Sequence, residues 1–185
     1  MAPATLTPKL QSVEALYRKL EREFVRAFHH KNLVHKSDHF YNFCVTAHSM
    51  RDHFLERLGK VDRSDRAPYI NAWDLEPCIV AVMDIANTVK HYQLRTKKGL
   101  PKSPRAKRVS DGKTTLFDVF LTSDGTPTFR KRSNVPTIII TLEDGGRLEM
   151  YEFMESVRSY WNRLLSTNGI RVRRQSWTAL HGKAS

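Results

Sequence analysis

The predicted fold depends most on the stretch Asp74-Leu-Glu-Pro-Cys-Ile-Val-Ala-Val-Met-Asp-Ile-Ala-Asn-Thr-Val-Lys-His-Tyr-Gln-Leu94. Its apolar residues lie almost all the way round a helix, so we expect that helix to be buried on most of its circumference. Polar residues nevertheless recur at spacings of three and four, which places them on one stripe: Asp84, Asn87, Thr88 and His91. Because burying unpaired polar groups is costly, this stripe needs partners, water or a function.

Apolar residues repeat every three or four positions in the flanking sequence as well, and they predict two earlier helices and one later helix. The predicted helices cover residues 8–30, 37–58, 74–94 and 151–168. Ser37 and Asp74 are the expected N-caps of the second and third helices. Residues 60–71 are polar and contain Pro68, which is typical of a link.

The remaining segments have different compositions. We predict a basic loop over 95–114, a β-meander over 115–150 and a basic tail over 170–185. The predicted fold is therefore mainly α with a small β insertion, a four-helix bundle with an antiparallel β-meander between helices 3 and 4. We expect one domain, 1–185, in which the meander packs against the bundle because so few strands are not stable alone.

Length, composition and cysteine content exclude several classes of protein. No segment of the 185 residues approaches the roughly 18 consecutive apolar residues of a membrane span. The first residues, Met1 to Pro8, lack the basic segment and apolar run of a secretory signal. Cys44 and Cys78 both lie in apolar helical patterns, which favours buried thiols over a disulfide. We therefore expect a reduced, cytoplasmic protein without a membrane partner.

The net charge is the second strong signal in the sequence. A formal charge of +12 favours a polyanionic partner, either RNA or DNA or an acidic protein, although a basic surface can also serve solubility alone. The cations that we expect to contact nucleic acid are Arg95, Lys97, Lys98, Lys102, Arg105, Lys107 and Arg108 in the basic loop, Arg130, Lys131 and Arg132 in the meander, and Arg171, Arg173 and Arg174 in the tail.

A second group of polar residues lies on the helix predicted over 37–58. If this helix packs against the next one, His48 and Arg51 can meet the stripe that contains Asp84 and His91. Three interpretations are open: an acid–base site with a cation holding an anion, a metal site, or a buried network that fixes helix register. The spacing contains no metal-binding motif, so we assign no metal and no cofactor.

Four histidines flank the predicted link between the first two helices: His29, His30, His35 and His39. They form either a metal-binding cluster or a partly exposed polar corner. The sequence contains no phosphate-binding Gly-rich loop, no dinucleotide fingerprint and no Gly-x-Ser-x-Gly elbow, which excludes common nucleotide-dependent and serine-triad enzymes.

The run Asp84-Ile-Ala-Asn-Thr-Val-Lys-His91, near the end of a bundle helix, resembles the HEPN superfamily of small helical bundles found in bacterial toxins, defence systems and RNA-processing enzymes. The resemblance covers residues of about 10 to 94. HEPN ribonucleases use an Arg and a His a few residues apart, cleave RNA without metal, and dimerise to bring two motifs together. In this chain Asn87 stands where the family places the Arg.

The resemblance implies a metal-independent endoribonuclease and a homodimer. His91 would be the acid–base group, with Lys90 and Arg51 on the phosphate and Asn87 or Asp84 orienting the imidazole. His48 completes the candidate catalytic set. Two alternatives are open: a non-enzymatic interaction protein that binds an acidic or nucleic-acid-bound partner, and a metal-dependent helical-bundle enzyme.

Overall fold

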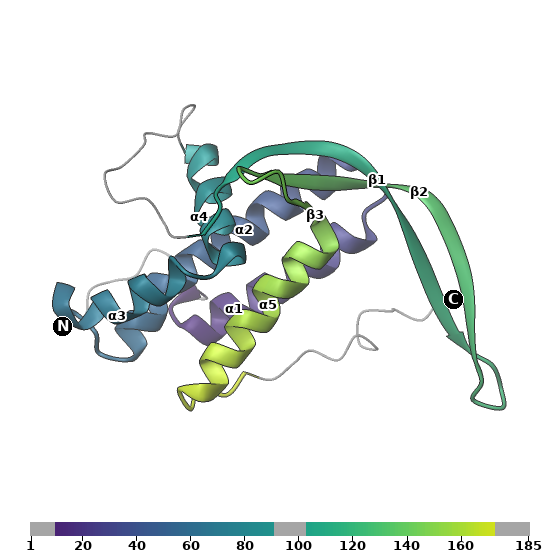
Figure 1. Ribbon diagram of the computed structural model, residues 1–185. Helices are drawn as coiled ribbons and strands as arrows, with labels where there is room; N and C mark the ends of the chain where they lie inside the picture. Colours follow the sequence, from purple (N-terminus) through teal and green to yellow (C-terminus); the bar gives the residue numbers. More distant parts are fainter. Residues whose placement is uncertain (1–9, 91–102, 173–185) are drawn as a thin grey trace.

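The protein is mainly helical with a small antiparallel sheet, as a computed structural model describes it for residues 10–90 and 103–172 (Figure 1). The described residues form five helices and three strands, in the order α1 (Val13–His29), α2 (Leu33–Arg57), α3 (Arg63–Trp73), α4 (Pro77–Lys90), β1 (Ala106–Leu121), β2 (Pro127–Leu142), β3 (Arg147–Glu149) and α5 (Met150–Thr167). This confirms the predicted class of fold. The arrangement as a four-helix bundle is not confirmed, because a fifth helix is present.

Helices α1 and α2 begin at side-chain caps. The Ser12 hydroxyl accepts a hydrogen bond from the backbone N–H of Ala15, and Asn32 accepts one from Val34. The predicted N-cap of the second helix, Ser37, is wrong, because this residue lies inside α2 and its hydroxyl donates to the carbonyl of Leu33. α1 begins at Val13, later than the predicted start near residue 8, because Ser12 is its N-cap. Residue 8 itself lies outside the described residues.

Helix α3 occupies the segment that the sequence predicts as a link. Its only buried residue is Trp73, so the segment has too few apolar positions to show a helical period. Pro68 lies inside the helix rather than in a loop. Asp74 is the C-cap of α3, and not the predicted N-cap of the next helix, which begins at Pro77.

The core lies between α2 and the helices that surround it. The buried ring of Trp73 lies 6.5 Å from the ring of Phe54 and 6.3 Å from that of Trp161, which joins α2, α3 and α5. On α4 the residues Ile79 and Val82 are buried, as expected for a helix that is apolar on most sides. The two cysteines are both free.

Strands β1 and β2 form a hairpin that begins at Ala106, well before the predicted start of the meander at residue 115. Residues 106–114, predicted as part of a basic loop, belong to β1, and β2 is continuous over its 16 residues. The half of the hairpin nearest its ends packs on the helices, where Ile138 and Ile140 are buried and β3 pairs with β2. This half ties the sheet to the core.

The hairpin changes register where it leaves the helices. Pairing is regular from Arg108 opposite Thr141 to Thr114 opposite Val135 and resumes at Leu116 opposite Arg132. Asn134 in the interruption has a φ of 58°. Beyond this point the two strands project away from the body (Figure 1). We call residues 116–132 the hairpin arm. Both of its faces are exposed to solvent.

Candidate functional site

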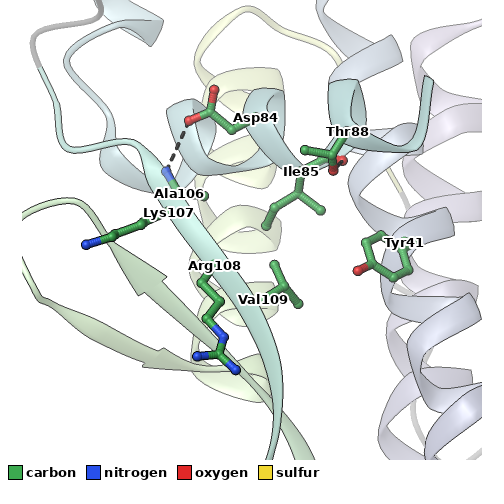
Figure 2. A pocket seen from close by; sticks show the side chains of 8 residues that line it. All are labelled: Tyr41, Asp84, Ile85, Thr88, Ala106, Lys107, Arg108 and Val109. Atoms are coloured by element: carbon green, nitrogen blue, oxygen red, sulfur yellow. Dashed lines mark hydrogen bonds between the residues drawn. The ribbon is translucent and has the colours of Figure 1, made fainter. Parts of the chain in front are cut away.

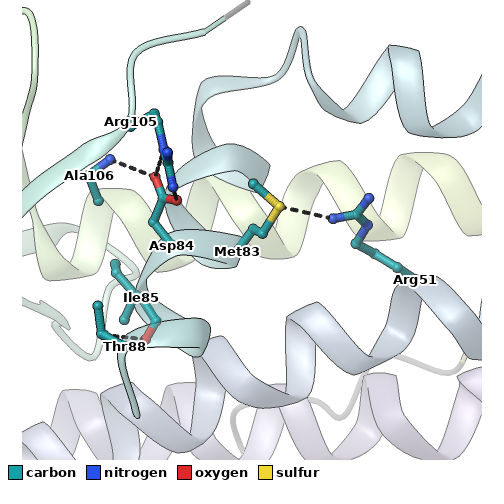
Figure 3. A network of polar contacts seen from close by, with 7 residues as sticks. All are labelled: Arg51, Met83, Asp84, Ile85, Thr88, Arg105 and Ala106. Carbon is teal, nitrogen blue, oxygen red and sulfur yellow. Dashed lines mark hydrogen bonds and ion pairs between the residues drawn. The ribbon is translucent and has the colours of Figure 1, made fainter. Parts of the chain in front are cut away.

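The polar stripe of α4 makes a buried ion pair. Asp84 is 1% exposed and its carboxylate accepts hydrogen bonds from Nε and Nη2 of Arg105, at 3.1 and 2.5 Å from Oδ1 (Figure 3). The backbone N–H of Ala106 donates to Oδ2 at 3.1 Å. The hydrogen bond from Arg105 to Asp84 raises the pKa of the guanidinium. Asp84 therefore joins α4 to the start of β1.

The other residues of the stripe differ in their surroundings. The Thr88 hydroxyl donates to the carbonyl of Ile85 at 2.7 Å, and Asn87 is half-buried. α4 ends at Lys90, whose side chain lies outside the described part of the chain, as does His91. The predicted acid–base group is thus not placed relative to the rest of the stripe.

Arg51 on α2 lies next to α4 but has other neighbours than Asp84. Its guanidinium carbon is 4.5 Å from the centre of the Trp73 ring, and Nη1 is 3.6 Å from the Met83 sulfur. Figure 3 shows the Met83 side chain pointing toward Arg51 and the Asp84 side chain pointing toward Arg105. Burial lowers the pKa of Arg51. His48, three residues earlier on the same helix, is half-buried.

A pocket of about 200 Å³ lies where α2, α4 and β1 meet (Figure 2). Its lining residues are Tyr41, Asp84, Ile85, Thr88, Ala106, Lys107, Arg108 and Val109. The pocket is smaller than the roughly 300–1,000 Å³ of sites for drug-sized ligands. Burial raises the pKa of the Tyr41 hydroxyl, which keeps that group neutral.

The charge at this pocket is positive. Arg105 neutralises the carboxylate of Asp84, whereas Lys107 and Arg108 are exposed on β1. The pocket therefore combines apolar walls and neutral hydroxyl groups with two cations, which is a suitable environment for a small anionic group such as a phosphate.

The predicted nucleic-acid contacts separate into three groups. Arg105 is 16% exposed in its side chain and is engaged with Asp84, so it contributes to the fold. The exposed cations are Lys107, Arg108, Arg130, Lys131, Arg132 and Arg171. The remaining predicted contacts lie outside the described residues: Arg95, Lys97, Lys98, Lys102, Arg173 and Arg174.

The cations of the hairpin arm are ordered by one acidic residue. Asp118 on β1 accepts a hydrogen bond from Nη2 of Arg130 at 3.1 Å and forms an ion pair with Arg132, whose Nη2 lies 2.9 Å from the carboxylate. The guanidinium of Arg130 also lies 5.2 Å from the centre of the Phe120 ring. Two arginines share a single carboxylate, so this face keeps a positive charge while its side chains are held in place.

The opposite face of the arm is apolar, and sequence reasoning missed it. Phe117, Val119, Leu121 and Phe129 are between 59% and 74% exposed. The alternation of apolar residues along 117–121 indicates one apolar face of a strand. The pattern does not show whether another layer of the protein covers that face. We expected the whole meander to pack against the bundle, and the arm does not.

The histidines between α1 and α2 resemble the second of the two interpretations given above, a partly exposed polar corner, and we call them the histidine corner. The rings of His35 and His39 lie 4.8 and 5.7 Å from that of His30, and Nδ1 of His39 is 2.8 Å from a carboxylate oxygen of Glu23. Within residues 10–90 and 103–172, no three His, Cys, Asp or Glu side chains are grouped so that they could hold a metal ion.

Comparison with known proteins adds no relative to this description. Neither a protein-family model nor a curated protein nor a solved structure matches the chain. Among the helices that the structure describes, none is long and apolar enough to cross a membrane.

Proposed function

We propose that this protein binds nucleic acid through the phosphate backbone. The observation that carries the proposal is the run Arg130, Lys131 and Arg132, which is exposed on an arm that projects from the body. Each phosphate that such a cation neutralises releases condensed counterions, and this release favours binding without any preference for sequence. The net charge of +12 adds long-range attraction.

The body of the protein offers a second group of cations on the other strand of the hairpin, β1. Lys107 and Arg108 lie at the end of β1 that is packed against α4, beside the pocket. A nucleic acid that follows the hairpin from the pocket to the arm would meet Lys107 and Arg108 on β1 at one end and the cations of β2 at the other. The span from Arg108 to Phe117 is at most about 30 Å, at ~3.3 Å per residue.

A binding measurement with charge variants tests the proposal. Fluorescence anisotropy with labelled RNA and DNA oligonucleotides should show affinity near 50 mM salt and a steep loss of affinity as salt increases. The triple variant Arg130→Gln, Lys131→Gln, Arg132→Gln should bind more weakly and with a flatter log–log slope, by up to roughly 2, since each contact with a single strand contributes about 0.7.

Arg63→Gln is the matched control, because Arg63 is exposed at the start of α3, in the body and away from the arm. It should bind like the native protein, and circular dichroism should show that all variants remain folded. If the native protein has no affinity for RNA or DNA even at 50 mM salt, the proposal is wrong and an acidic protein becomes the better candidate partner.

A HEPN-like endoribonuclease is the second proposal, and the pocket favours it. Two residues of the α4 stripe, Asp84 and Thr88, line the pocket together with two cations, and His91 follows Thr88 by three positions in the sequence. Arg105 and Ala106 already donate hydrogen bonds to the Asp84 carboxylate. Asp84 would therefore position neighbouring groups through its charge and would not act as a general base. Cleavage of labelled RNA in the presence of a chelator tests the activity.

A further inference from the structure

The hairpin arm has two chemically different faces, and its strand register defines them. Residues paired across an antiparallel hairpin project to the same side. The pairs Phe117–Lys131, Val119–Phe129 and Leu121–Pro127 therefore form one face. The pairs Leu116–Arg132, Asp118–Arg130 and Phe120–Thr128 form the other, which holds the arginine–carboxylate cluster.

The apolar face presents two phenylalanine rings together with a cation. Phe117 and Phe129 are diagonal neighbours on the two strands, and their side chains are 61% and 65% exposed. Lys131, directly opposite Phe117, is exposed on the same face. The acidic residues of the arm lie elsewhere, since Asp118 is on the other face and Asp124 is in the turn, where it bonds Thr122 and Thr126.

The size of this face does not suit a second copy of the chain. Two phenylalanines, a valine and a leucine at these exposures offer roughly 400–500 Å². A stable protein–protein interface needs about 800 Å² from each partner, so the arm alone falls well short of a stable homodimer. The positive charge of Lys131 on this face instead complements an anionic partner that has flat apolar groups.

We propose that this face stacks the bases of single-stranded nucleic acid. The proposal rests on the nucleic-acid binding proposed above and deepens it. Bases of a single strand are free to stack on Phe117 and Phe129 whatever their sequence, while Lys131 on the same face holds a phosphate. In a duplex the bases already stack on one another, so a duplex can use the cations and cannot use the rings.

The test compares single-stranded and double-stranded probes with ring variants. The probes are a labelled oligo(dT) and an oligo(U) of about 20 nucleotides and a mixed-sequence DNA duplex of the same length, each measured by anisotropy in the same moderate salt. Native protein should bind the single strands more tightly than the duplex. Phe117→Ala and Phe129→Ala should each weaken single-strand binding by about 5-fold to 100-fold and leave duplex binding almost unchanged.

Phe120→Ala is the matched control, because it removes a phenylalanine from the opposite face of the same arm. The Phe120 ring lies beside Arg130, so any effect through that cation should change single-strand and duplex binding alike. Its single-strand affinity should stay within about twofold of native. The thermal melting of all three variants should match native, since these side chains are exposed on the arm and leave the core intact.

Five outcomes overturn the inference. If the duplex binds as tightly as the single strands or more tightly, base stacking is wrong. The same holds if the double variant Phe117→Ala, Phe129→Ala binds single strands like native protein. Neither result contradicts binding through the phosphates. A loss in Phe120→Ala as large as in the other two variants removes the assignment to one face. Self-association in analytical ultracentrifugation that the ring variants abolish would make the face a contact between copies. Absence of binding to every probe defeats the proposed function itself.

Discussion

Arg105 and Asp84 face each other across 21 residues of sequence, and two guanidinium nitrogens of the first bond the carboxylate of the second. The pair holds α4 against the start of the sheet. β1 begins at Ala106, directly after Arg105, and the backbone N–H of Ala106 donates to the same carboxylate. A buried pair of this kind is costly to break from one side, since the remaining charge is left without a partner.

We therefore expect Asp84→Ala to lower the free energy of unfolding by about 3–5 kcal/mol, measured by urea denaturation. Arg105→Ala should have an effect of similar size. In the double variant no unpaired charge remains, so its loss should be clearly smaller than the sum of the two single losses. Additive losses would contradict the pairing.

Lys36 is a second buried charge with a structural role. It is 4% exposed, and its ammonium donates to the carbonyls of Ala27 and Phe28 at 2.9 and 3.4 Å, at the C-terminal end of α1. Burial lowers the pKa of this lysine. Lys36→Met should leave both carbonyls without this partner and cost about 1–3 kcal/mol of unfolding free energy. The exposed Lys31→Met is the control and should change stability by less than about 0.5 kcal/mol.

The histidine corner predicts a dependence of stability on pH. Burial, and then the neighbouring His35, His39 and Lys36, lower the pKa of His30 below its ordinary value of 6.5. The unfolded chain therefore binds a proton more readily than the folded chain, and stability is full above about pH 6.5 and falls as the pH drops through the folded pKa. Melting temperature between pH 7.5 and 5 should fall less in His30→Gln than in native protein. Parallel curves would contradict this.

Removing the negative charge of Asp118 on the arm should raise the affinity of the protein for nucleic acid. Asp118 neutralises part of the charge of Arg130 and Arg132, both of which are exposed toward solvent. Asp118→Asn should raise the affinity for RNA and DNA at low salt and steepen its dependence on salt, because one more cation is available to phosphate. The same substitution at Asp65, which is exposed on α3, should change binding much less. Weaker binding by Asp118→Asn would mean that ordering the arginines matters more than their free charge.

Replacement of His91 separates catalysis from structure. If the chain is a metal-independent ribonuclease, His91→Ala should abolish cleavage in the presence of chelator and leave RNA affinity and melting temperature near their native values. If the residue belongs to a structural network, the same variant should lose about 1–3 kcal/mol of stability. Native-like cleavage by His91→Ala would remove this residue from the catalytic proposal.

Four of the five helices could be predicted from the sequence because their buried sides repeat at helical spacing. α1, for example, buries Leu16, Leu20, Phe24 and Ala27 on one face. α3 could not be predicted in this way, since only Trp73 at its end is buried. Its conformation depends on local backbone bonding and on neighbours such as the carbonyl of Lys60, to which Arg66 donates.

The candidate site was predictable only in part. The polar stripe of α4 can be read from spacing, and Asp84 does lie in a buried network. Its partner Arg105 could not be identified, because the pairing depends on how the chain returns after a long connection. The strand over 106–114 could not be predicted either. Its charged residues face solvent, and only the half-buried Ala106 and Val109 pack against the core, so the segment lacks the apolar alternation of a strand.

The change of register at Thr114 and Asn134 makes the protein modular. Packing against the helices ends there, so the sequence beyond it is released from the volume and polarity constraints of the core. Substitutions, lengthening or shortening in 116–132 should pass without cost to folding, whereas the body tolerates little change. The arm should accordingly keep its conformation when it is transplanted to another antiparallel hairpin.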